Sequence, residues 1–122
     1  MKLLIVEDEA ITALHLSVEF RKLGCAVSTE ASGEGALRRA DRENPDAVLM
    51  DIHLAGKLDG VETAKALGKG TRASIVFMSG YERGGLEDRL RREIGPQARL
   101  FPKPLSGSVI GEVLRAFEAC LE

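Results

Sequence analysis

Cysteine is scarce in this chain, and so are aromatic residues and long apolar runs. The two cysteines, Cys25 and Cys120, form neither a CxxC pair nor a metal-type spacing, which favours free thiols in a reducing cytoplasm over a disulfide framework. Aromatic side chains make up 4% of the residues, and tryptophan is missing. Because no apolar run approaches the roughly 18 residues of a membrane span, we expect a cytoplasmic protein that makes no contact with a membrane.

An excess of positive charge is also missing. The sequence has 17 Lys and Arg against 19 Asp and Glu, for a formal net charge of -2. Direct nucleic acid binding normally requires a basic excess, so this balance argues against contact with DNA or RNA. Residues 1–8 turn acidic at Glu7 and Asp8 and contain no cleavage site, so they lack the features of a signal peptide.

The length and composition of the chain are typical of one globular domain. With 122 residues, 44% of them hydrophobic and 30% charged, the chain can bury roughly two thirds of the surface that it exposes when unfolded. No linker, low-complexity tract or internal repeat interrupts it, so we expect a single domain over residues 1–122. Met1 directly before the first expected strand indicates a natural N-terminus, whereas the end at Glu122 fits either a stand-alone protein or a fragment that lacks an output domain.

Short apolar runs alternate with segments of helical periodicity. The apolar runs predict strands at residues 3–6, 26–29, 47–50, 75–78 and 100–101. Segments with apolar residues three or four positions apart predict a helix after each strand, and the last, residues 110–121, has the strongest amphipathic pattern. The first helix carries two apolar stripes, one of Ile11, Leu14 and Val18 and the other of Leu16, Phe20 and Leu23.

This alternation predicts an α/β fold with a doubly wound, five-stranded parallel sheet. Consecutive parallel strands need crossover helices, and right-handed crossovers place helices on both faces of the sheet. In open sheets of this kind, ligands bind beyond the carboxyl ends of the strands, where the strand order reverses. For the flavodoxin-like order 2-1-3-4-5, adopted here from known folds of this type, that point lies between the first and third strands.

Polar side chains stand at the carboxyl ends of the strong strands: Glu7 and Asp8, then Asp51, then Ser79, then Lys103. The fold would bring the three carboxylates together. Two unit charges about 4 Å apart repel by roughly 4 kcal/mol at an effective dielectric constant near 20. The three must therefore take up protons or hold a cation, and Mg²⁺, which prefers oxygen ligands, fits. Taken singly, each residue also has an ordinary explanation as a first-turn acid, a turn residue or a solvated lysine.

Four sequence elements, in this order, resemble the receiver domain of two-component response regulators, the CheY-like family. They are the acidic pair in Val6-Glu7-Asp8-Glu9, the strand Val48-Leu49-Met50-Asp51, the strand end at Ser79 and the pair Lys103-Pro104. Each element alone is a weak signal, but together they extend over essentially the whole chain. The resemblance implies a flavodoxin-like receiver fold and a role in phosphorelay signal transduction.

The resemblance also implies a role for each site residue. Asp51 would be the phosphoacceptor that attacks the phosphohistidine of a sensor histidine kinase or a histidine phosphotransfer protein, and would become an aspartyl phosphate. Asp8 would bind Mg²⁺ directly, Glu7 would bind it through water or lie close by, and His53 would contribute its backbone carbonyl. Lys103 and Ser79 would each hold a phosphoryl oxygen, because the transition state spreads negative charge over these oxygens.

A receiver of this kind is a signalling phosphoprotein rather than a conventional enzyme, since it catalyses only its own phosphoryl transfer and dephosphorylation. Its downstream protein target would bind the face formed by the fourth helix, the fifth strand and the fifth helix. Two other function classes stay open: a phosphate-independent adaptor, and a small phosphatase with an aspartyl nucleophile. The adaptor would have no need of the complete set of site residues. Many such phosphatases have a second Asp two positions after the nucleophile, where this chain has His53.

Some positions depart from the usual receiver pattern. Ala55 stands where a proline is familiar, and the turn at Asp59-Gly60 lies one residue further from Asp51 than is common. Leu100 lies three residues before Lys103, at the position where receivers usually have an aromatic side chain that takes part in switching. Phe101 is adjacent, but strand alternation points it to the opposite face of the sheet.

The run Phe77-Met78-Ser79-Gly80-Tyr81 is similar to the FAT GUY subgroup of receivers, whose members lack the switch aromatic and are often stand-alone proteins. In such a receiver, the signal would pass through the loop after the fourth strand and through the fourth helix. Gly80, Gly84 and Gly85 would make that loop easy to rearrange.

Overall fold

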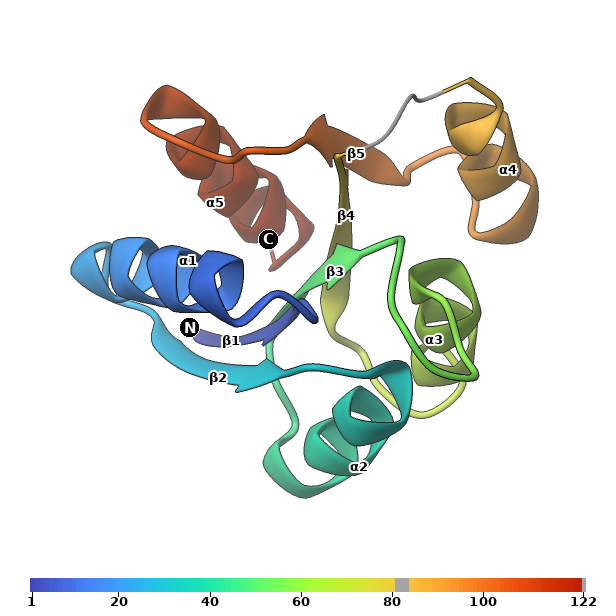
Figure 1. Ribbon diagram of the computed structural model, residues 1–122, viewed down its shortest axis with the longest axis horizontal. Helices are drawn as coiled ribbons and strands as arrows, with labels where there is room; N and C mark the ends of the chain where they lie inside the picture. The colour runs from blue at the N-terminus through green and yellow to red at the C-terminus, as the bar shows by residue number, and fades with distance from the viewer. Residues whose placement is uncertain (81–83, 122) are drawn as a thin grey trace.

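The computed structural model describes the backbone of residues 1–80 and 84–121 and the side chains up to residue 119. Strands and helices alternate over these residues, as Figure 1 shows. In chain order, the elements are β1 (Lys2–Val6), α1 (Ala10–Lys22), β2 (Ala26–Glu30), α2 (Gly33–Glu43), β3 (Ala47–Asp51), α3 (Gly60–Leu67), β4 (Ser74–Ser79), α4 (Leu86–Glu93), β5 (Arg99–Pro102) and α5 (Ser108–Leu121).

The strands form one parallel sheet in the order β2-β1-β3-β4-β5, which confirms the predicted fold class and strand order. Helices α1 and α5 cover one face of the sheet, and α2, α3 and α4 cover the other (Figure 1). Side chains of the central strands alternate between the two layers. Leu3 and Ile5 pack toward α1 and α5, whereas Leu4 and Val6 pack toward α2 and α3. Every residue of β3 is buried, as expected for a central strand covered on both faces.

The first helix buries part of one apolar stripe and leaves the other stripe exposed. Leu16 and Phe20 are buried against the sheet and α5, whereas Leu23, directly after the helix, is 49% exposed. The stripe of Ile11, Leu14 and Val18 lies on the outer side of α1, with exposed fractions of 85%, 63% and 42%. Residues three and seven positions apart share one side of a helix, so the three side chains form a continuous apolar surface that begins in the first turn of α1.

The two hydrophobic residues of β5 point to opposite faces of the sheet, as the alternation predicts. Leu100 packs in the core layer that contains Leu90 of α4, and Phe101 packs in the layer that contains α5. The guanidinium of Arg99 lies 5.6 Å from the centre of the Phe101 ring. A simple rotation of the Phe101 side chain therefore cannot place an aromatic ring where Leu100 lies, between β5 and α4.

A glycine allows α3 to begin directly against the end of β3. A Cβ atom at Gly60 would lie 2.1 Å from the carbonyl oxygen of Asp51, so no other residue fits without a backbone shift. The Gly60 N–H donates to the carbonyl of Ile52 at 2.8 Å. Asp59 caps the helix and forms a capping box with Glu62. The connection from β3 to α3 is therefore fixed close to the carboxyl end of the sheet.

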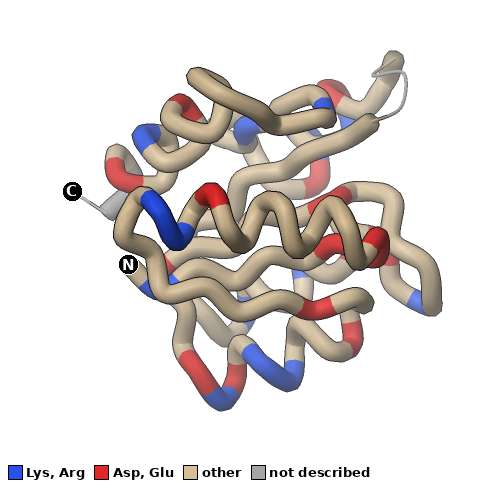
Figure 2. Tube along the Cα trace, turned by 60° about the vertical axis from the view of Figure 1, so that its left-hand side comes forward, with Lys and Arg blue, Asp and Glu red and all other residues tan. Residues whose placement is uncertain are grey.

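Ion pairs connect α4 to α3 on the outside of the molecule. The Arg89 guanidinium contacts Asp59 at 3.0 Å and Glu93 at 2.8 Å, and Lys65 contacts Glu93 at 3.3 Å. The hydrogen bond to Glu93, and after it the contact with Asp59, raise the pKa of Arg89. Figure 2 shows basic and acidic residues interspersed along the visible helices, an arrangement that allows such pairing. The pairs link the start of α3, next to the end of β3, to the helix that follows β4.

We expect the substitution Arg89→Ala to lower the free energy of unfolding by about 1 kcal/mol, because it removes the centre of a partly buried ion-pair network. Arg91→Ala is the matched control on the same helix. Arg91 pairs only with Asp88 among its described partners, and its side chain is 60% exposed, so its loss should change the stability little. Urea unfolding monitored by circular dichroism measures both. Equal effects of the two substitutions would contradict the structural role of the network.

Candidate functional site

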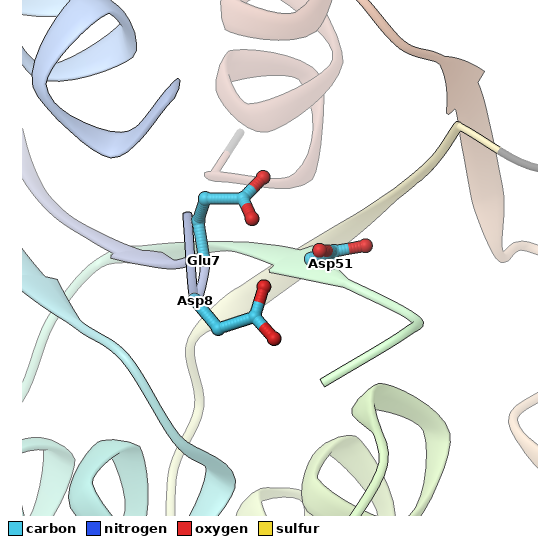
Figure 3. Close-up of side chains that lie close together, drawn as sticks. All are labelled: Glu7, Asp8 and Asp51. Atoms are coloured by element: carbon cyan, nitrogen blue, oxygen red, sulfur yellow. The ribbon is translucent and has the colours of Figure 1, made fainter. Parts of the chain in front are cut away.

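Three carboxylates meet at the carboxyl edge of the sheet. Glu7 and Asp8 directly follow β1, and Asp51 is the last residue of β3. The two strands are neighbours, and their register pairs Val6 with Met50. Figure 3 shows Glu7 and Asp8 extending from the end of β1 toward Asp51. One carboxylate oxygen from each residue lies within 4.8 Å of the others, which confirms the convergence predicted from the strand ends.

The ammonium group of Lys103 lies between two of these carboxylates. Its Nζ is 2.7 Å from Oε1 of Glu7 and 3.2 Å from Oδ2 of Asp51. The second oxygen of each carboxylate accepts a backbone N–H: Glu7 Oε2 accepts from Glu9 at 3.1 Å, and Asp51 Oδ1 accepts from His53 at 3.2 Å. Both buried carboxylates are thus held by one cation and one main-chain donor.

Burial strengthens the electrostatic interactions in this pocket. Glu7 and Asp51 are each only 2% exposed. Burial raises the pKa of the Glu7 carboxyl above its usual value, although the hydrogen bond from Lys103 acts in the opposite direction. Burial disfavours the charged form of Lys103 as well, but its contacts with Glu7 and Asp51 outweigh that penalty and raise the pKa of the ammonium. When all four groups are ionised, three negative charges face one positive charge, which leaves an excess of negative charge.

The donor set of this pocket fits Mg²⁺. The candidate ligands are carboxylate oxygens of Glu7, Asp8 and Asp51, close enough together to share one ion, and hard oxygen donors are what Mg²⁺ prefers. A divalent cation would balance the excess negative charge that Lys103 leaves. Asp8 is the exposed member of the group, and its Oδ2 accepts the main-chain N–H of Ala55 at 3.1 Å.

Lys103 reaches the pocket from the end of β5. The main-chain N–H of Lys103 donates to the main-chain carbonyl of Ser79 at 2.9 Å, so the ends of β4 and β5 lie side by side. The aliphatic part of the Lys103 side chain passes within 3.7–3.9 Å of the point where a Cβ at Gly80 would lie. Ser79 ends β4 next to the Asp51 strand and is 1% exposed. The peptide bond between Lys103 and Pro104 is cis.

The structure brings together four of the predicted site residues, Glu7, Asp8, Asp51 and Lys103, and places Ser79 at the neighbouring strand end. The side chain of His53 is exposed, and its backbone N–H contacts Asp51. Sequence reasoning missed the main-chain donors of Glu9 and Ala55, because a backbone N–H carries no residue-type signal.

Within the described residues, no helix has the length and apolar character that crossing a membrane requires.

Comparisons with known proteins agree with this geometry. The sequence profile of the response regulator receiver domain matches residues 3–95. The transcriptional regulatory protein PdtaR of Mycobacterium tuberculosis is 31% identical over 118 residues, which cover 96% of this chain and 55% of PdtaR. PhoP of Bacillus subtilis, a transcriptional regulatory protein of alkaline phosphatase synthesis, is 39% identical over 66 residues, or 54% of this chain and 27% of PhoP. This chain thus spans about half or less of the length of these curated relatives.

A solved structure of similar sequence has the same fold. The signal receiver domain of a modulated diguanylate cyclase from Desulfovibrio desulfuricans is 31% identical, with a TM-score of 0.85 over 98% of this chain and 95% of that one. The family match covers most of the chain, and the strand order and acidic pocket agree with it. The protein therefore belongs to the receiver domains of two-component response regulators.

Proposed function

We propose that this receiver accepts a phosphoryl group on Asp51 from the phosphohistidine of a sensor histidine kinase or a histidine phosphotransfer protein. The observation that carries the proposal is the pairing of the buried Asp51 with Lys103 beside two further carboxylates in one pocket. A lone acid at a strand end needs no such partners. The four groups together match what phosphoryl transfer requires, namely an oxygen nucleophile, a fixed cation and oxygen ligands for a metal ion.

In the proposed transfer, a carboxylate oxygen of Asp51 forms a bond to phosphorus while the bond from phosphorus to the donor imidazole nitrogen breaks. The electron pair of that bond returns to the imidazole, which leaves as the neutral ring after it takes up or retains a proton. Mg²⁺, bound by Asp8 and Asp51 with Glu7 close by, would neutralise charge on the phosphoryl oxygens. Lys103 would move from its contact with Asp51 to a phosphoryl oxygen, and Ser79 would hold another.

The proposed output follows from the same contacts. Ser79 ends β4, Lys103 directly follows β5, and the segments after them lead to α4 and α5. A phosphoryl group that contacts Ser79 and Lys103 would favour a different position of these ends, and so bias the face of α4, β5 and α5 toward binding a protein target. Assignment to the FAT GUY subgroup is part of this proposal. Leu100 and the Phe77–Gly80 run support it, whereas Tyr81 lies outside the described residues.

The proposal leaves two molecular contexts open. The chain is either a stand-alone regulator or the receiver part of a longer regulator, as its partial coverage of PdtaR and PhoP allows. The receiver domain of RstA from Klebsiella pneumoniae, 25% identical with a TM-score of 0.84 over 94% of this chain and 96% of that one, was solved in a BeF3-activated form. That similarity supports a phosphate-dependent switch over a phosphate-independent adaptor.

Incubation with acetyl phosphate and MgCl₂, followed by intact-mass measurement, tests the proposal. We expect one added phosphoryl group per chain, and its loss over time in buffer as the acyl phosphate hydrolyses. No uptake by the wild-type chain would contradict the proposal and favour the adaptor. Steady release of product from a phosphate ester such as p-nitrophenyl phosphate would favour the phosphatase.

The exposed stripe on α1 gives a second test, because a protein donor must lie over the mouth of the pocket. Ile11 stands in the first turn of α1, close in the chain to Asp8, and Leu14 continues the stripe. We expect Leu14→Ser to slow transfer from a phosphorylated histidine phosphotransfer protein by about tenfold, the effect of losing one central apolar contact. Transfer from acetyl phosphate should not change, because that donor needs no docking surface.

Leu23→Ser is the matched control for this substitution. Leu23 is also an exposed leucine at 49%, but it lies at the far end of α1 and outside the stripe. It should leave transfer from both donors unchanged. Equal rates for Leu14→Ser and wild type with the protein donor would exclude the stripe as the docking surface.

A further inference from the structure

The loop between β3 and α3 supplies a hydrogen bond to the exposed carboxylate of the acidic pocket. The main-chain N–H of Ala55 donates to Oδ2 of Asp8 at 3.1 Å, across 47 positions of sequence. Asp8 is exposed, and an exposed aspartate without such a contact moves freely between rotamers. A carboxylate has two oxygens, so one can accept the loop N–H while the other stays available to a cation. Proline, familiar in receivers at position 55, has no N–H to donate.

Contacts on both sides of Ala55 hold this part of the loop in place. The side chain of Leu54 is 9% exposed and packs in the hydrophobic layer that contains Val61 of α3. On the other side, the N–H of Leu58 donates to Oε1 of Glu34 at 3.1 Å. Gly56, between them, has a φ of +105°, a conformation that glycine adopts without strain. The Ala55 N–H is therefore presented by an ordered loop rather than by a freely moving one.

We infer that the main-chain N–H of Ala55, held in place through Glu34, is the positioning group that orients Asp8 toward Mg²⁺. The inference rests on the proposed function in one respect, namely that the acidic pocket binds Mg²⁺. Hydrogen bonds to a ligating carboxylate fix its orientation, and loss of such a partner typically lowers metal affinity by about 10–100-fold. Glu34 and Ala55 act on the metal only through Asp8 and are not ligands themselves.

The first matched pair changes the donor at position 55. The Ala55 side chain is exposed, so its replacement removes no buried contact. Ala55→Pro deletes the N–H, and we expect a Mg²⁺ dissociation constant about tenfold higher than that of the wild type. Ala55→Gly keeps the N–H and should change the constant by about twofold at most, through the greater freedom of the loop.

The second pair changes the support of the loop and does not depend on proline. Glu34→Ala removes the acceptor of the Leu58 N–H, a partly buried hydrogen bond. We expect about threefold weaker Mg²⁺ binding, the size of one lost hydrogen bond. Glu34→Gln removes the same negative charge but keeps a carbonyl oxygen that can accept the N–H. It should bind Mg²⁺ like the wild type, which separates hydrogen bonding from long-range charge.

Titration of ¹⁵N-labelled protein with MgCl₂, followed by amide chemical shifts, measures all five proteins. Amide exchange at Ala55 gives a readout that needs no metal, since Asp8→Ala should speed it. Weaker binding by Ala55→Pro and Glu34→Ala, with near wild-type binding by Ala55→Gly and Glu34→Gln, supports the inference.

Wild-type affinity in Ala55→Pro or in Glu34→Ala would overturn the inference. If Ala55→Pro loses its folded spectrum, the Glu34 pair decides by itself. Acetyl phosphate labelling of the same samples distinguishes failure of the positioning role from failure of the proposed function. If the wild type takes up phosphate and the variants bind Mg²⁺ as tightly as the wild type, only the positioning role is wrong. A wild type that neither binds Mg²⁺ nor takes up phosphate defeats the proposed function as well.

Discussion

Asp51→Asn should take up no phosphoryl group from acetyl phosphate, under conditions in which the wild-type chain takes up one. The neutral amide of asparagine is a poor nucleophile toward phosphorus and forms no acyl phosphate. The size of asparagine and its carbonyl oxygen allow it to keep the hydrogen bond that Asp51 Oδ1 accepts from His53. The expected loss is therefore chemical rather than structural. Intact-mass measurement, with circular dichroism as a check on folding, reports both.

Asp46→Asn is the matched control for the nucleophile. Asp46 directly precedes β3, at the opposite end of the strand from Asp51, and its side chain accepts the N–H of Lys2. Uptake by this variant should equal that of the wild type. Full uptake by Asp51→Asn would mean that another group is the acceptor, and equal loss in both variants would point to unfolding.

Asp8→Asn should abolish the effect of Mg²⁺ on both stability and phosphoryl uptake. For the wild type, Mg²⁺ at ten times its dissociation constant should add about 1.4 kcal/mol to the free energy of unfolding, or about 5 °C in Tm for a chain of this size. Asp8→Asn removes a charged ligand from the three-carboxylate group. In EDTA, we expect it to raise the Tm, because it relieves repulsion that no metal then balances.

Thermal unfolding with and without MgCl₂ measures this effect. Asp41→Asn, which changes an exposed aspartate near the end of α2, removes the same charge outside the pocket. It should keep the full Mg²⁺ response. A Mg²⁺ response that survives in Asp8→Asn but not in Asp41→Asn would place the metal site elsewhere.

The order of elements was predictable because each strand is a short apolar run between polar turns. β3 is the clearest case, since Ala47 to Met50 is apolar and Asp51 ends the run. The orientation of α1 was not predictable in the same way. Both of its stripes are apolar, and only packing against α5 and the sheet selects Leu16 and Phe20 over Ile11 and Leu14 for burial. A periodic pattern identifies a helix, but tertiary contacts determine which face is buried.

The residue types of the site were predictable, whereas its hydrogen bonds were not. Carboxylates and a lysine at successive strand ends follow from the sequence and the strand order, because parallel strands end at the same edge. The sequence does not indicate that Lys103 contacts Glu7 more closely than Asp51. Nor does it indicate the contact between Asp8 and Ala55, which depends on the path of a loop rather than on a side chain.

Locating the phosphoryl group in the chain is the most direct measurement of what this pocket does. Borohydride reduces an aspartyl phosphate to homoserine, so reduction of the phosphorylated protein and peptide mass analysis identify the modified residue. We predict homoserine at position 51 and at no other aspartate. Homoserine at Asp8 or at an aspartate outside the pocket, or its absence from a protein that has taken up phosphate, would contradict the assignment of Asp51 as the phosphoacceptor.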